Sequence, residues 1–320
     1  MTRAVVALGL WLAWAPIACA LVACAAAVSP SVGADASPGS IPIRDRYAQA
    51  RLDLLDAINA DRAAAGVAPV ALDSLATVVA QAHAEAMAAY GFFSHYGPAG
   101  DAPYERLAEA GGTVHVLENV FRWRQRASSP PSVGDPWARF DVLRAEARLM
   151  SSPAHRRTIL SPHRTAVGLG LAVDRAKGAV YVVQDFIARY LDLEVPRRAW
   201  RASSTQVSGR ARASGVRPLL IVLRREVQPR AWQAREESPP GGPYADGTGE
   251  GTILPPWAIE WRPTDRSFTV TLPIGRGSDP GRYYGIVYVA PERIVRRALD
   301  RGSVDTEDGW PGGAFVIELL

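Results

Sequence analysis

The sequence predicts an α+β domain followed by an all-β sandwich of the immunoglobulin-like kind. Between residues 43 and 190, helical periodicity comes first and strand-like runs come last, without the regular alternation of an α/β fold. From residue 198 to 320 the chain has many glycines and prolines, no long helical period and several short apolar runs. A chain of 320 residues is long enough for two such domains.

The first domain is expected to hold four helices and then two strands. Leucines at helical spacing begin the first helix, and Gly66 is placed to end it. Asp73 is a natural cap for the second helix, and Gly91 follows its end. The expected helices are 52–65, 74–90, 103–110 and 137–150, and the expected strands are 167–173 and 179–187.

The second domain is expected to consist of short strands separated by turns. Residues 219–223 form a continuous apolar run, and residues 267–272 alternate apolar and polar side chains. The expected strands are 206–213, 219–223, 267–272, 283–289 and 314–319, with one short helix over 294–299.

The amino terminus has the composition of an export signal. Arg3 precedes an apolar run to Val28, so we expect residues 1–23 to be a signal and residues 24–42, rich in Ala, Ser, Pro and Gly, to be a flexible tether. Leu-Val-Ala-Cys24 resembles the bacterial lipobox, which predicts a lipidated Cys24 at the membrane, whereas Ala18-Cys19-Ala20 offers an ordinary cleavage site. The protein is expected to be exported, either lipid-anchored to the cell envelope or secreted.

Cysteine and charge exclude several classes of protein. Cys19 and Cys24 are the only cysteines, so the two domains have no disulfide and no Cys-based metal site. The formal net charge is +4, and the arginines are spread along the chain among acids instead of clustering. A nucleic-acid partner is therefore not expected.

Short motifs along the first domain resemble a known family. They include Phe93-Ser94-His95, Glu118-Asn119, Ser152-Pro153-Ala154-His155 and Val183-Gln184-Asp185-Phe186. In this order and spacing they are similar to the bacterial form of the CAP superfamily (cysteine-rich secretory proteins, antigen 5 and pathogenesis-related 1), over residues 50–188. The resemblance implies an α-β-α sandwich with one large cleft.

The resemblance also places candidate residues in that cleft. His95 and His155 match the two motif histidines of the bacterial form, and Glu118 matches the acid of the Gly-Glu-Asn motif, with Asn119 and Ser152 beside them. Two neutral imidazoles can bind zinc or another divalent metal, and a nearby carboxylate can orient one of them or act as a base. The alternative for the histidines is a pair of hydrogen-bonded structural residues, and for Glu118 a buried carboxylate that binds backbone amides.

This chain departs from the family at several positions. Leu117 stands where the family has glycine, and Leu149 stands where it has tryptophan. Ser152 and Tyr181 occupy the positions of the second acid and second cleft histidine of eukaryotic members. The eukaryotic set of two histidines and two acids is therefore not reproduced, and Glu146 or Asp101 is left to supply a second acid.

Two functions remain open after these observations. The first is a non-enzymatic envelope module that binds a small apolar or envelope-derived ligand in the cleft, while the β domain docks a protein partner. The second is a metal-assisted hydrolase of peptidase or esterase type, in which Glu118 is the base. Because hydrolysis also needs a placed base and an oxyanion donor, the incomplete residue set favours binding.

Overall fold

The computed structural model describes residues 43–124, 137–201, 204–226 and 251–320. The expected signal, the tether and Cys24 lie outside these ranges. Within them, no helix has both the length and the apolar character that a membrane crossing requires.

The first part of the fold is built on a four-stranded sheet. Its order is β1 (Ala71–Leu72), β3 (Ala166–Asp174), β4 (Ala179–Ala188) and β2 (His115–Arg124). The short strand β1 runs parallel to β3, and the other neighbours are antiparallel. β2 therefore lies at the end of the sheet, a position that matters for the site below.

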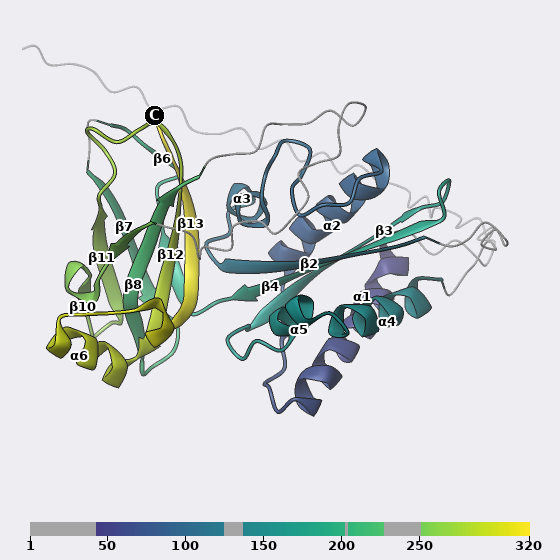
Figure 1. Ribbon diagram of the computed structural model, residues 1–320, viewed down its shortest axis with the longest axis horizontal. Coiled ribbons are helices and arrows are strands. Elements are labelled where there is room, and N and C mark those ends of the chain that lie inside the picture. Colours follow the sequence, from purple (N-terminus) through teal and green to yellow (C-terminus); the bar gives the residue numbers. More distant parts are fainter. Residues whose placement is uncertain (1–42, 125–136, 202–203, 227–250) are drawn as a thin grey trace, which may run out of the picture. The chain divides into compact units, whose positions relative to one another are not determined.

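Helices cover both faces of this sheet, as Figure 1 shows. On one face, α2 (Ser74–Tyr90) and α3 (Pro103–Glu109) pack on side chains such as Val116 and Ile187. On the other face lie α1 (Ile43–Ala64), α4 (Trp137–Met150) and α5 (Pro153–Ile159), which surround Phe186. This is the α-β-α layering that the family resemblance implies.

Helix α2 is fixed at both ends and packs unusually close to the sheet. The Asp73 carboxylate accepts a hydrogen bond from the amide of Ala76, and Gly91 ends the helix in the left-handed conformation with φ of 74°. Gly168 and Gly170 of β3 face the helix backbone, where any side chain would collide with Ala76 or Ala80. These two glycines thus set the distance between α2 and the sheet.

The second part of the fold is largely β. One sheet has the order β10-β11-β7-β5, and a second sheet has the order β6-β13-β12-β8-β9. Phe268 and Val207 of the first sheet pack against Ile221 and Phe315 of the second. The element bounds are β5 Leu191–Glu194, β6 Arg198–Ala199, β7 Thr205–Ala211, β8 Val216–Arg225, β9 Thr252–Leu254, η1 Pro256–Ala258, β10 Glu260–Arg262, β11 Ser267–Leu272, β12 Gly281–Pro291, α6 Glu292–Arg301, η2 Thr306–Asp308 and β13 Trp310–Leu319.

The two parts share a hydrophobic core within one compact unit, residues 41–320. Tyr104 and Leu107 of α3 belong to the same buried cluster as Tyr284 and Ile286 of β12. The outer face of the second β sheet is therefore covered in part by α3 and in part by α6.

Three elements of the first part were not expected from the sequence. These are β1, β2 and α5, of which β2 and α5 carry candidate site residues. Of the expected elements, the other helices and both strands are present with ends shifted by one residue at most, whereas α1 begins at Ile43, nine residues before its expected start. The architecture is thus α+β followed by a largely β region that also contains α6.

Candidate functional site

A cleft of about 530 Å³ opens beside the edge strand β2. It is formed by the loop after α2, by β2, by the end of α4 and by the start of α5. The lining residues are Phe93, Ser94, His95, Val120, Phe121, Arg122, Arg148, Leu149, Ser152 and His155. Three of the five residues predicted for the cleft, His95, Ser152 and His155, thus line one cavity.

His95 is held in the cleft wall by Glu118. The Nδ1–H of His95 donates to Oε1 of Glu118 over 2.8 Å. The Glu118 side chain is completely buried, whereas 19% of the His95 side chain is exposed. Glu118 therefore lies behind the imidazole and directs its Nε2 edge toward the cleft.

Arg106 of α3 supplies the positive charge beside Glu118 and the loop that carries His95. Its Nη2 donates to Oε2 of Glu118 over 2.6 Å, and its Nη1 donates to the carbonyls of His95 and Asp101, each over 2.8 Å. One guanidinium therefore fixes both the carboxylate and the backbone of the loop that carries His95. Such a planar, multiply bonded donor is well suited to a buried carboxylate.

A second histidine fixes the same loop from the α2 side. Burial lowers the pKa of His83 to about 4, so the ring is neutral at physiological pH. Its Nε2 lies 2.9 Å from the carbonyl of Ser94, to which it donates. The Ser94 hydroxyl in turn accepts from the amide of Tyr96. His83 and Ser94 thus act as loop supports.

The second acid beside Glu118 is Asp185, not Glu146 or Asp101. Asp185 lies directly opposite Glu118 in the β2–β4 pair, and the two buried carboxyl groups interact. Burial and the neighbouring Glu118 raise the pKa of Asp185, whereas Arg106, His83 and His95 outweigh burial and lower the pKa of Glu118. Folding therefore favours the protonated form of Asp185 beside the ionised form of Glu118.

His155 approaches the cleft from the other face of the sheet. Asn119 of β2 donates to the His155 carbonyl over 3.3 Å and to Oε1 of Gln184 over 3.1 Å. Burial, followed by the charge of His95, lowers the pKa of His155. His155 is thus neutral at physiological pH, and Asn119 supports it from below instead of lining the cleft. Ser152 is the residue before α5 and makes no capping bond with its side chain.

A buried carboxyl group continues this network below the cleft. Gln184 donates through Nε2 to Oε2 of Glu146, which belongs to α4. Burial and the charge of Asp61 raise the pKa of Glu146 to about 7, although the Gln184 hydrogen bond works in the opposite direction. Glu146 thus supports the site through Gln184 and Asn119.

The raised pKa of Glu146 predicts a loss of stability with rising pH. The carboxyl has a reference pKa of 4.5 and a folded-state value of about 7, so folding favours its protonated form. Its stabilisation is complete below pH 4.5 and is lost between pH 4.5 and 7, by about 3 kcal/mol at ~1.4 kcal/mol per pKa unit. Urea unfolding from pH 4 to 8 should show this decrease in the wild type, and Glu146→Gln should reduce it. Equal pH dependence in both proteins would contradict the assignment.

The imidazoles of His95 and His155 are the metal donors that the cleft lining offers. In the part of the chain that the structure describes, no three His, Cys, Asp or Glu side chains are placed to hold a metal ion. Catalytic zinc sites typically use three protein ligands, whereas this cleft presents the imidazoles of His95 and His155. Glu118 is already engaged by His95 and Arg106.

Comparison with known proteins places the first part of the chain in a family. The model of the cysteine-rich secretory protein family, CAP, matches residues 55–186. This confirms the resemblance expected over residues 50–188. No curated protein matches the chain.

Two solved structures resemble the same part of the chain. One is an extracellular protein containing a SCP domain from Bacillus anthracis, with 21% identity, 47% of this chain and 45% of that chain covered, and a TM-score of 0.35. The other is an outer surface protein from Borrelia burgdorferi, with 13% identity, 47% of this chain and 97% of that chain covered, and a TM-score of 0.36. The match thus spans less than half of the Bacillus anthracis chain.

Proposed function

From the premise that residues 55–186 are a CAP domain, we propose that this protein is an exported binding module of the cell envelope. Its cleft beside His95 and His155 would take a small envelope-derived ligand with an apolar body and an anionic group. One observation carries the proposal. The described residues that line the cleft combine apolar side chains with two arginines and two histidines, and none of them is acidic.

The two arginines give the cleft its preference for an anion. Arg122 lies over the ring of Phe93, 4.8 Å from its centre, and thereby combines a cation with an aromatic wall. Arg148 extends from the last turn of α4. Val120, Phe121 and Leu149 supply the apolar surface between them. An amphiphilic anion satisfies both kinds of surface, whereas a cation would meet like charge.

The arrangement supports binding more than hydrolysis. Glu118 has its oxygens directed at His95 and Arg106 and is completely buried, so it is not placed to take a proton from water in the cleft. The two imidazoles by themselves are fewer than the three protein ligands common in catalytic zinc sites. The carboxylate is better explained as the group that orients His95.

Export and anchoring are proposed from the amino-terminal sequence. The apolar run after Arg3 and the lipobox-like Leu-Val-Ala-Cys24 support a lipid anchor, and Ala18-Cys19-Ala20 supports secretion without one. Mass spectrometry of the mature protein separates the two. A diacylglyceryl group on Cys24 would establish the anchor, and an amino terminus beyond Cys24 would exclude it.

We also propose that the β region is an immunoglobulin-like sandwich that docks a protein partner. In chain order, β5, β7, β10 and β11 correspond to strands A, B, D and E of one immunoglobulin sheet. β8, β12 and β13 correspond to C, F and G of the other, with β9 beside C. The short strand β6 pairs in parallel with β13. This strand order supports the assignment.

Titration with decanoate tests the cleft proposal. We expect decanoate to bind more tightly than decanol, and decylamine to bind more weakly than either. Replacing Arg122 and Arg148 together by Gln should weaken decanoate binding about tenfold, because two partly exposed ion pairs together contribute about 1.4 kcal/mol. Isothermal titration calorimetry measures all of these affinities.

The substitution Ser152→Trp tests the same proposal by filling the cleft with a bulky side chain. The Ser152 side chain makes no capping bond, so the substitution fills the cleft without removing a helix cap. Ala154→Trp is the matched control, because Ala154 is exposed and does not line the cleft. Decanoate should bind to the control and not to Ser152→Trp. Equal binding to both variants, or equal affinity for decanoate and decylamine, would refute the proposed site.

A further inference from the structure

Helix α3 contacts the β region and the cleft residues through consecutive side chains. Tyr104 and Glu105 contact the β region, and the next residue, Arg106, holds Glu118 and the His95 loop. We propose that the β region controls the geometry of the cleft through α3, with Tyr104 and Glu105 as positioning residues. The part of this inference that concerns ligand affinity rests on the proposed binding function.

The first contact is between aromatic rings. Tyr104 stacks on Tyr284 of β12 with ring centres 4.0 Å apart and an angle of 17° between the planes. Its hydroxyl donates to Oε2 of Glu226, just after β8, over 2.6 Å. Both tyrosines are almost fully buried. The stack and the charge-assisted hydrogen bond fix Tyr104 in both position and direction.

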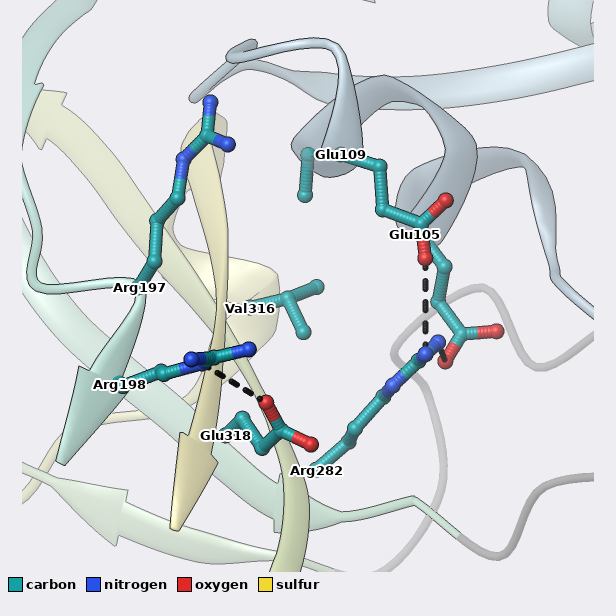
Figure 2. Close-up of a pocket in the computed structure, with 8 residues that line it drawn as sticks. Glu105, Glu109, Arg197, Arg198, Arg282, Val316 and Glu318 are labelled. Carbon is teal, nitrogen blue, oxygen red and sulfur yellow. Dashed lines mark hydrogen bonds and ion pairs between the residues drawn. The ribbon is translucent and has the colours of Figure 1, made fainter. Parts of the chain in front are cut away.

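The second contact is an ion pair at the other side of the helix. Arg282 of β12 donates through Nη1 to Oε1 of Glu105 over 3.0 Å and lies 3.5 Å from Glu109. Figure 2 shows Arg282 extending from the β region toward these two carboxylates, at the edge of a cavity of about 220 Å³. The other Glu105 oxygen accepts from the amide of Ala102, the residue before α3. Arg282 therefore holds the same carboxylate that starts the helix.

The helix is too short and too constrained to absorb a shift of these contacts. It has seven residues, begins with Pro103 and is capped by Glu105. Displacing Tyr104 or Glu105 would therefore move Arg106 as well. Arg106 binds Glu118 and two loop carbonyls, so its displacement would change how Glu118 and the loop present His95 to the cleft.

Tyr104→Phe and Arg282→Gln test this coupling, each against Tyr283→Phe. The Tyr283 hydroxyl also lies on β12 and donates to the Asp279 carbonyl over 2.9 Å, but Tyr283 belongs to the sandwich core on the opposite face of the sheet. The control thus removes one tyrosine hydroxyl bond without touching α3. Two readouts are needed: the ¹⁵N–¹H signals of the Arg106 guanidinium and the affinity for decanoate.

We expect both test variants to speed hydrogen exchange at Arg106 and to weaken decanoate binding about fivefold, the lower end of ordinary coupling between sites. The control should change neither. Thermal unfolding identifies any variant that fails to fold, and the other variant then decides. If hydrogen exchange at Arg106 and the affinity for decanoate in the folded variants match those of the control, the proposed coupling is overturned. If the wild type binds no decanoate, the cleft proposal fails by itself, and the Arg106 signals alone decide the coupling.

Discussion

Replacing Arg106 with methionine is expected to lower the free energy of unfolding by about 3–5 kcal/mol and to abolish binding in the cleft. The substitution leaves Glu118 buried without its guanidinium partner, and breaking a buried ion pair from one side has a cost of this size. It also releases the carbonyls of His95 and Asp101. Urea unfolding measures the first effect and decanoate titration the second.

Two variants show whether this effect comes from burial. Arg212 and Asp192 form an ion pair of 2.6 Å on the surface, so Arg212→Met should change stability by less than about 1 kcal/mol. Adding Glu118→Gln to Arg106→Met should recover part of the lost stability, because the uncompensated charge is removed. Equal losses for Arg106→Met and Arg212→Met would contradict the role given to Arg106.

Gly170→Ala is expected to lower the free energy of unfolding by about 3 kcal/mol or more, the upper end for overpacked cores. A Cβ atom at this position would lie 2.1 Å from the carbonyl oxygen of Ala80, in the backbone of α2. Because the obstacle is backbone, α2 must move away from the sheet as a unit. The loop that holds His95 follows α2, so ligand affinity should fall as well.

Gly215→Ala is the matched control for that substitution. Gly215 has φ of 78° and open space around it, so alanine there should cost only about 1 kcal/mol of backbone strain. Chemical denaturation of the two variants separates steric collision from strain. A Gly170→Ala protein as stable as Gly215→Ala would show that α2 does not pack against β3 at this distance.

Much of the fold could be predicted because its local signals agree. Asp73 and Gly91 bound α2 as their cap preferences indicate, and the apolar run over 179–187 corresponds to β4. β2 was missed because Glu118 and Asn119 interrupt its apolar pattern. They are buried all the same, since each finds a partner far along the chain in Arg106 or Gln184. Such long-range partners are not visible in local periodicity.

The candidate site could be predicted only in part, because its long-range contacts are likewise not visible in local periodicity. The motifs identify His95, Glu118, His155 and Ser152, which the structure brings together. They also identify Asn119, which lies below these residues. They do not identify Arg106 and Asp185 as partners of Glu118. A signal for Asp185 was present, because a carboxylate within the buried strand 180–187 requires either a charge partner or a proton. The pairing itself depends on strand register, which the sequence alone does not specify.

Chemical-shift mapping of the ¹⁵N-labelled protein during a decanoate titration tests the central claim most directly. The account predicts that the amides of Phe93, Ser152 and His155 and the ring nitrogens of His95 shift together and saturate, while residues around the surface ion pair of Arg212 stay unchanged. Saturating shifts elsewhere with an unchanged cleft, or no saturating shift at all, would contradict the conclusion that this cleft is a binding site for amphiphilic anions.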